Sequence, residues 1–188
     1  VQTRCEMALE SNNIIVTASR NLISRKSKLF KTEDIIVDGC SIISDLATIR
    51  GDLAPIHIGR YCFFGVQSVL RPPLDNGSVA QFASQTAMDY VVIEDRAIVR
   101  AALIESCTHI MEGAVIGERC ILGPCSRVLP DSVVPADTVV PPLCIVGGNP
   151  AVIVDRVGSQ FENTWIERCV NMHREATAIL NTKQTTTN

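Results

Sequence analysis

The sequence predicts an all-β fold, a single-stranded parallel β-helix of about five to six coils followed by a C-terminal α-helix. The first observation is a six-residue repeat, because every sixth residue from Ile104 onward is a branched aliphatic. The positions of this unbroken run are Ile104, Ile110, Ile116, Leu122, Val128, Val134, Val140, Val146 and Val152. An α-helix, with about 3.6 residues per turn, cannot keep an apolar stripe at period six. Three hexapeptides do close one triangular coil of a parallel β-helix.

The same register predicts which side chains are buried. Because side chains alternate across a strand, the first and fifth places of each hexapeptide point inward and the sixth points outward. The fifth place usually holds a small residue such as Thr108, Ala114 or Cys120. Each buried aliphatic contributes roughly 1.5–3 kcal/mol, and an unpaired charge at an inward place should cost several kcal/mol.

The second observation is the composition, which combines 46 % hydrophobic with only 4 % aromatic residues in a chain of 188. A narrow β-helix core explains this imbalance, and the length suits one domain. The net charge of −3 and the lack of a basic run give no reason to expect a nucleic-acid partner. We see no signal peptide and no apolar run of about 20 residues, so we expect no membrane insertion.

The chain contains eight cysteines, none of them in a Cys-x-x-Cys pair. Cys62, Cys120 and Cys144 occupy the small inward place, where a thiol acts as a small hydrophobic group. We therefore assign no metal ligands and expect a reducing compartment, with zinc or disulfides as the less favoured alternative.

Breaks in the register divide the chain into segments. The expected boundaries are 1–27 for a lead-in segment, 28–158 for the β-helix, 71–90 for a loop insertion within it, 159–181 for the C-terminal helix and 182–188 for a disordered tail. The loop follows Arg71-Pro72-Pro73, since proline cannot donate to a sheet ladder. The helix is predicted by apolar residues at helical spacing between Phe161 and Ile179. Ser159 and Glu162 form a candidate capping box at its start.

A three-residue skip interrupts the repeat between Ile49 and Ile58. The inward places on either side stay in phase, so the inserted residues must bulge outward at a corner of the coil. Gly51 permits a tight turn there. We expect Arg50 and Asp52 to pair with each other or with a neighbouring coil.

The segment from Ile49 to Gly59 resembles the corner of γ-class carbonic anhydrases, a hexapeptide-repeat family that binds zinc through three histidines. Aligning the hexapeptides places the three ligand positions on Arg71, near Asp95 and on Arg100. None of these is a histidine, and a guanidinium offers no lone pair to a metal. The resemblance therefore implies the scaffold without the zinc chemistry.

A more extensive resemblance links residues 17–146 to the dynactin subunit 5 family. The shared residues include Thr17-Ala18-Ser19, Ser24-Arg25, Ile36-Val37-x-Gly39, Ile49-Arg50-Gly51-Asp52-Leu53-Ala54, Gly59-Arg60, Cys62, Arg71-Pro72-Pro73, Val99-x-Ala101-Ala102-x-Ile104 and Val140-Pro141-Pro142. The loop at 74–90 and the C-terminal helix match poorly. Parallel crossovers are nearly always right-handed, but hexapeptide-repeat families are an exception, so the resemblance implies a left-handed β-helix.

This resemblance implies a non-catalytic subunit at the pointed end of dynactin, the cofactor complex of the dynein motor. The implied partners are dynactin subunit 6, other pointed-end subunits and cargo adaptors. The implied location is cytoplasmic and associated with the cytoskeleton, and no cofactor is implied. Self-association of the isolated chain stays open.

The outward places argue for assembly independently. Many of them are apolar and should form flat strips, namely Phe63, Val69, Val92, Ile98, Val115, Ile121, Val133, Val139 and Ile145. We expect the C-terminal helix to cover one strip and the others to contact partners. The candidate interaction residues are Arg50, Asp52, Arg71, Val115, Val133, Ile121 and Val139. The alternative is that β-branched residues simply suit strands.

An acyltransferase is the alternative function, because hexapeptide-repeat proteins include that enzyme class. Such enzymes commonly use a histidine base near a subunit interface. His109, at an outward place, is the candidate base, with coenzyme A bound between the chains of a homotrimer. A lone histidine is a weak signal, so we assign no catalytic residue and rank the acyltransferase and a degenerate carbonic anhydrase-like protein below the assembly subunit.

Overall fold

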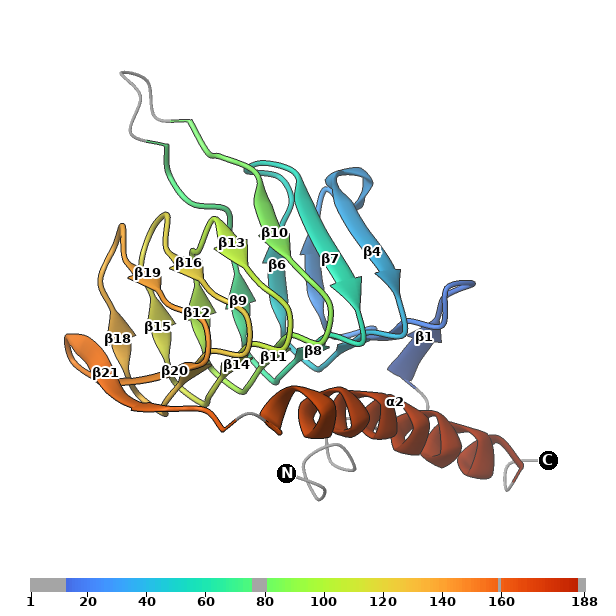
Figure 1. Ribbon diagram of the computed structural model, residues 1–188. Helices are drawn as coiled ribbons and strands as arrows, with labels where there is room; N and C mark the ends of the chain where they lie inside the picture. Colours follow the sequence, from blue (N-terminus) through green and yellow to red (C-terminus); the bar gives the residue numbers. More distant parts are fainter. Residues whose placement is uncertain (1–12, 76–80, 159, 186–188) are drawn as a thin grey trace.

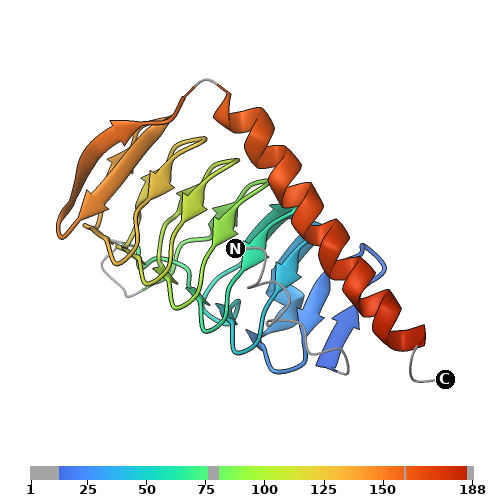
Figure 2. The same ribbon diagram turned by 90° about the horizontal axis from the view of Figure 1, so that it is seen from below.

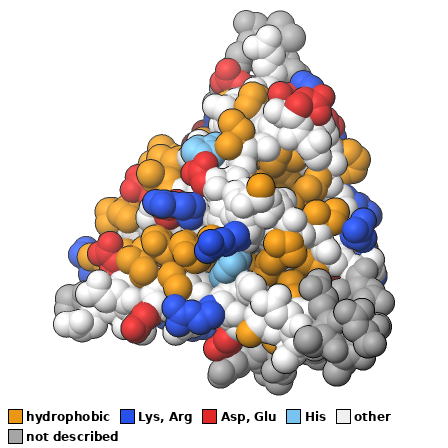
Figure 3. Space-filling model, turned by 90° about the vertical axis from the view of Figure 1, so that its right-hand side faces the viewer, with side chains coloured by type: hydrophobic (Ala, Val, Ile, Leu, Met, Phe, Trp, Pro, Cys, Tyr) orange, Lys and Arg blue, Asp and Glu red, His pale blue; other side chains and the backbone are white. Residues whose placement is uncertain are grey.

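The computed structural model describes residues 13–75, 81–158 and 160–185, without the side chains of 183–185. In this part of the chain, three sheets wind into a β-helix of about six coils, and α2 (Phe161–Thr185) lies along its outside (Figure 1). The molecule has a triangular outline when seen from the end nearest β4 (Ile35–Gly39), where charged side chains lie among hydrophobic ones (Figure 3). The predicted parallel β-helix with a C-terminal helix is confirmed, while its left-handed winding stays a prediction.

Each coil contributes one strand to each of the three sheets. The covered sheet, so named because α2 packs on it, runs in the order β1 (Ile14–Val16), β2 (Leu22–Ser24), β5 (Ile42–Ile43), β8 (Phe63–Phe64), β11 (Val92–Ile93), β14 (His109–Ile110), β17 (Arg127–Val128), β20 (Cys144–Gly148) and β21 (Ala151–Arg156). The β19–β4 sheet runs in the order β19 (Val139–Val140), β16 (Ile121–Leu122), β13 (Leu103–Ile104), β10 (Gln85–Ala87), β7 (Ile56–Arg60) and β4. The β18–β3 sheet runs in the order β18 (Val133–Val134), β15 (Val115–Ile116), β12 (Ile98–Val99), β9 (Val69–Leu70), β6 (Thr48–Arg50) and β3 (Lys28–Phe30).

The core is a set of parallel stacks of inward side chains, one stack for each sheet. Register pairs such as Ile93 with Ile110 place the same hexapeptide position directly above itself in successive coils. In the covered sheet the buried stack contains Ile43, Phe64, Ile93, Ile110, Val128 and Val146. The cysteines predicted at small inward places, Cys62, Cys120 and Cys144, are buried as well. The six-residue repeat therefore predicted the core correctly as far as Val146.

The last repeat position, Val152, is not inward. The chain turns back after Gly148, and β21 pairs antiparallel with β20 instead of starting another coil. Val152 is 60 % exposed as a result. The prediction for Val152 is therefore wrong, because a hairpin strand keeps its own two-residue alternation and can reproduce a period-six pattern by coincidence of register.

The first coil begins earlier than the predicted start at residue 28. The short strand β2 already pairs in parallel with β5, with Leu22 beside Ile42. Before it, β1 pairs antiparallel with β2. The short 3-10 helix η2 (Thr32–Asp34) joins β3 to β4. The first part of the predicted lead-in segment, residues 1–12, lies outside the described residues.

One edge of the prism, which we call the corner ladder, is formed by residues in the left-handed backbone conformation. Their φ angles lie between 53° and 62°. All of them join the β19–β4 sheet to the covered sheet except Arg20, which lies in the turn between β1 and β2. The ladder contains Arg20, Cys40, Tyr61, Tyr90, Cys107, Cys125 and Leu143. Each coil is tied to the preceding one here, as where the backbone N–H of Cys125 donates to the carbonyl of Ser106 at 3.0 Å. The ladder therefore holds equivalent side chains one above another.

The helix α2 runs across the covered sheet (Figure 2), which confirms that it covers one apolar strip. Its buried stripe is Trp165, Cys169, His173, Ala176 and Leu180. Two of these side chains donate to carbonyls of the corner ladder, Trp165 to Tyr90 at 3.0 Å and His173 to Arg20 at 2.8 Å. The helix continues to Thr185, beyond the expected end at 181. Ser159 of the predicted capping box and residues 186–188 of the predicted tail lie outside the described residues.

The insertion after β9 leaves the prism at Arg71 and returns at β10. Pro72 and Pro73 are buried, and an isolated antiparallel bridge joins Leu74 to Phe82. The register then resumes at Ala87, which is fully buried. The coil therefore starts again at β10, inside the expected loop range of 71–90.

Candidate functional site

Arg71 and Arg100, two of the three positions where the carbonic anhydrase resemblance would need zinc ligands, both face Glu118. Nη2 of Arg71 donates to Oε1 of Glu118 at 3.2 Å, and Nε of Arg100 lies 3.8 Å from the same oxygen. The backbone N–H of Leu74 donates to the other carboxylate oxygen at 2.8 Å. Guanidinium groups have only donors, so this site does not fit a zinc ion. Its chemistry is an ion-pair cluster that ties the start of the insertion to the β-helix.

Asp95, at the remaining one of those positions, binds the backbone of the neighbouring coil. Its Oδ1 accepts a hydrogen bond from the backbone N–H of Val66 at 2.8 Å. The chain passes so close at Gly65 that a Cβ there would lie 2.5 Å from the nitrogen of Asp95. The carboxylate therefore caps a tight turn.

The corner insertion contains the predicted ion pair between Arg50 and Asp52. Nε of Arg50 donates to Oδ1 of Asp52 at 2.7 Å, and Nη2 donates to Oδ2 at 2.8 Å. The guanidinium also lies over the ring of Phe30, 5.1 Å from its centroid. Both charged side chains are partly exposed. This bidentate pair holds the corner rigid and presents it to solvent.

His109, the candidate acyltransferase base, is enclosed by α2. It occupies an outward place, as predicted, but only 4 % of it is exposed because Trp165 packs on its ring at a centroid distance of 4.6 Å. Its Nε2 lies 2.9 Å from Oε1 of Glu94. Burial lowers the pKa of His109, and Glu94 partly opposes that shift. A base in this position cannot contact an acyl acceptor unless α2 moves away.

The predicted apolar strips fall on different sheets. Phe63, Val92 and Ile145 lie on the covered sheet, the first two buried and packed in the cluster under α2. The interaction candidates lie on the two sheets without a helix, Val115 and Val133 on the β18–β3 sheet and Ile121 and Val139 on the β19–β4 sheet. Of these four side chains, Val139 is 63 % exposed, and the other three are partly buried.

An exposed apolar surface lies at the end of the β-helix formed by the last coil, where Val139 and Val152 are 63 % and 60 % exposed. A groove of about 320 Å³ opens between β19 and the β20–β21 hairpin. We call this region the open end, and its lining residues are Val134, Thr138, Val139, Val140, Pro141, Val146, Ala151, Val152 and Ile153. Sequence reasoning missed it because Val152 was assigned inward. The turn residues Gly147-Gly148-Asn149-Pro150 were the signal that the coil ends there.

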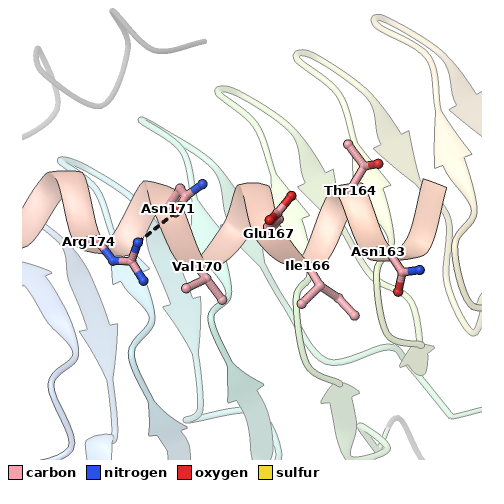
Figure 4. Close-up of a pocket in the computed structure, with 7 residues that line it drawn as sticks. All are labelled: Asn163, Thr164, Ile166, Glu167, Val170, Asn171 and Arg174. Atoms are coloured by element: carbon pink, nitrogen blue, oxygen red, sulfur yellow. Dashed lines mark hydrogen bonds between the residues drawn. The ribbon is translucent and has the colours of Figure 1, made fainter. Parts of the chain in front are cut away.

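A second hollow, of about 450 Å³, lies on the exposed flank of α2 (Figure 4). All of its lining residues belong to this one helix, and most are polar: Asn163, Thr164, Ile166, Glu167, Val170, Asn171 and Arg174. Small-molecule sites are usually concave and mostly apolar. This polar hollow on a single helix therefore does not resemble a small-molecule site. Among the described residues, no helix is long and apolar enough to cross a membrane.

Comparison with known proteins identifies the family. The model of the family described as Dynactin subunit 5 matches residues 3–173. The chain belongs to the dynactin subunit 5 family. A curated member from Dictyostelium discoideum, Dynactin subunit 5, is 34 % identical over 99 residues. That alignment covers 52 % of this chain and 50 % of the relative, so the chain spans about half the length of this relative.

Solved structures similar to this member of the dynactin subunit 5 family include acyltransferases. A mutant of AntD, an N-acyltransferase from Bacillus cereus in complex with dTDP and coenzyme A, superposes with a TM-score of 0.63 at 15 % identity, over 79 % of this chain and 89 % of that one. AntD with dTDP and 3-hydroxybutyryl-CoA gives 0.52 at 16 % identity, over 89 % and 96 %. At such identities the likeness shows the shared fold alone.

Proposed function

We propose that this chain is a non-catalytic assembly subunit of the dynactin pointed-end complex, a scaffold that links the cofactor of the dynein motor to cargo. Its proposed partners are dynactin subunit 6 and the other pointed-end subunits, with cargo adaptors as further contacts. The proposed location is the cytoplasm, in association with microtubules and dynein. Membership of the dynactin subunit 5 family supports this proposal.

The open end is the observation that carries the scaffold proposal. Core positions Val134, Val140 and Val146 line its groove, and Val139 and Val152 at its rim are among the most exposed apolar side chains described. Exposed apolar patches on soluble proteins commonly mark interaction sites. A partner with a matching apolar face would remove this surface from water, at roughly 25 cal/mol for each Å² of apolar area buried.

Two further features favour a structural role. Two of the three positions of the carbonic anhydrase ligands belong to an ion-pair cluster around Glu118. The histidine placed like an acyltransferase base is covered by Trp165. The Glu118 cluster joins different coils, and the contact of His109 with Trp165 joins α2 to the coils. Contacts of this kind stabilise the fold, which supports a structural role.

The test is absolute mass by light scattering, on the chain alone and mixed with dynactin subunit 6 from the same organism. We expect a complex of one chain with one partner. A chain that stays monomeric beside that partner would count against the proposal.

The acyltransferase alternative is tested separately by a thermal-shift titration with acetyl-coenzyme A. A ligand that binds only the folded state raises the unfolding temperature, so an acyltransferase should respond at millimolar ligand. We expect no shift. A clear shift, together with a homotrimeric mass, would support an acyltransferase and make His109 the first residue to substitute.

A further inference from the structure

Two cysteines and one glutamate from distant parts of the sequence meet where α2 begins. The thiols of Cys107 and Cys125 and the carboxylate of Glu162 place one ligand atom each within 4.8 Å of one another. Both cysteines are buried, and Glu162 is exposed on the solvent side. We propose that these three side chains form a Zn²⁺ site that fastens the first turn of α2 to the β-helix.

The fold itself brings the two thiols together. Cys107 and Cys125 occupy the same place in consecutive coils of the corner ladder, with φ angles of 61° and 56°. Neighbouring strands in a sheet are about 4.8 Å apart, so equivalent side chains on the ladder leave the backbone in parallel at that spacing. The sequence separation of eighteen residues, one full coil, hides this pair from a search for Cys-x-x-Cys motifs.

The separation suits zinc after a small contraction. Zinc binds thiolate sulfur at about 2.3 Å and carboxylate oxygen at about 2.0–2.2 Å, in tetrahedral geometry. Those bond lengths put the ligand atoms roughly 3.5–3.8 Å apart. Closing the remaining distance requires only side-chain rotation at Glu162, which is exposed, and minor adjustment at the thiols. The fourth position then faces solvent beside Glu162 and is available to water.

The protonation of the two thiols depends on whether a cation is bound. Burial, followed by the neighbouring Cys125 and Glu162, raises the pKa of the Cys107 thiol to about 12. Burial and then Glu162 also raise the pKa of Cys125. Without a cation the thiols therefore keep their protons. A divalent ion reverses this balance, since a coordinating thiol is deprotonated outright and the two protons pass to solvent as the metal–sulfur bonds form.

A packing role is the competing interpretation, because buried thiols also serve as small hydrophobic groups. The two interpretations differ in one respect. Packing does not need Glu162, whereas a zinc site uses its carboxylate as a ligand. The corner ladder provides a matched control in Cys40, which occupies the same place in another coil, and α2 provides another in the exposed Glu167.

The experiment is a titration of the chelator-treated full chain with Co²⁺, followed by displacement with Zn²⁺. We expect one equivalent of Co²⁺ to give a thiolate-to-cobalt charge-transfer band with the intense visible absorption of tetrahedral coordination, and Zn²⁺ to abolish both. Cys125→Ser should remove the band, and Glu162→Gln should lower the Zn²⁺ affinity by at least about tenfold. Cys40→Ser and Glu167→Gln should leave band and affinity unchanged.

The absence of a thiolate-to-cobalt band in the unsubstituted chain would overturn the proposal, as would equal Zn²⁺ affinity in the chain and in Glu162→Gln. Because Glu162 is exposed, its substitution should leave the fold intact even where Cys125→Ser unfolds, and circular dichroism checks this. No dynactin partner takes part in the assay, so its outcome is independent of the scaffold proposal.

Discussion

The rings of Trp165 and His109 pack against each other with their centroids 4.6 Å apart, joining α2 to the covered sheet. Trp165 also stacks on Phe161 and donates to the carbonyl of Tyr90. The imidazole Nε2 of His109 also lies 2.9 Å from Oε1 of Glu94, within hydrogen-bond distance. This contact turns an outward position of the repeat into part of a second, smaller core between the helix and the prism.

Trp165→Ala should therefore loosen α2 from the β-helix. Truncating a buried tryptophan typically costs about 3–5 kcal/mol, and here a hydrogen bond to Tyr90 is lost as well. Urea denaturation followed by circular dichroism measures the loss. Asn163→Ala, on the exposed flank of the same helix, is the control and should change the free energy of unfolding by less than about 0.5 kcal/mol.

His109 should make stability depend on pH. Burial lowers its pKa below the ordinary value of 6.5, with Arg127 and Arg168 lowering it further and Glu94 opposing them. Well above pH 6.5, the ordinary pKa of histidine, the imidazole is neutral in both states, so its contribution is fully present there. As the pH falls, the unfolded chain takes up the proton first, and stability is lost.

Urea midpoints measured at a series of pH values across this range should fall toward low pH more steeply in the unsubstituted chain than in His109→Gln. The exposed His57 supplies the control variant, His57→Gln, which should keep the steep dependence. Parallel curves for the chain and His109→Gln would contradict the assignment.

Because the last coil ends before Val152, a charge should be tolerated at Val152 but not at Val146. Val146 is an inward residue that is 4 % exposed, whereas Val152 lies outside. Val146→Asp buries an unpaired charge and should cost several kcal/mol, enough to unfold much of the chain at 25 °C. Val152→Asp should be tolerated. Soluble expression and thermal unfolding of the two variants check this, and equal losses would restore the inward assignment of Val152.

The open end should be the part of the surface that partner binding needs. Val139 and Ile36 lie on the two edge strands of the β19–β4 sheet, at opposite ends of the prism, and are 63 % and 60 % exposed. Val139→Lys should weaken binding to dynactin subunit 6, because a charge would have to be desolvated in an apolar contact. Ile36→Lys should not. Light scattering of each mixture tests this, and an unaffected Val139→Lys complex would move the interface elsewhere.

Glu118 should stabilise the start of the insertion. Glu118→Gln removes the charge that faces Arg71 and Arg100, and it leaves guanidinium groups with weaker partners, at a cost of about 1–3 kcal/mol. Hydrogen exchange at the Leu74 amide, which donates to Glu118, should become faster. Glu167→Gln is the control, and unchanged exchange at Leu74 would indicate that the cluster contributes little.

The fold was predictable because one physical requirement repeats along the chain. A coil of fixed circumference needs an inward aliphatic at the same place in every hexapeptide, so Ile93, Ile110 and Val128 mark the core without any knowledge of distant contacts. The outward position of Arg50 and Asp52 was also predictable. The inward places on both sides of the three-residue skip stay in phase, so the inserted residues must lie outside the coil.

Other features were not predictable from periodicity. The hairpin at Val152 preserves the repeat while reversing the chain, so only the turn residues distinguish it from a further coil. The position of α2 over His109 depends on a tertiary contact with Trp165. The meeting of Cys107 with Cys125 depends on the number of residues in one coil, and that number becomes visible only when coils are superposed.

The open end also bears on the protein before it meets any partner. There β18 and β19 are edge strands of their sheets in the described structure, and an edge strand offers unpaired backbone groups to any other chain. A newly synthesised copy without its partner is thus a template for intermolecular strand pairing. If the proposed partner covers this end, we expect a cell to keep orphan copies scarce, through chaperones or degradation, so that the abundance of the chain follows that of this partner.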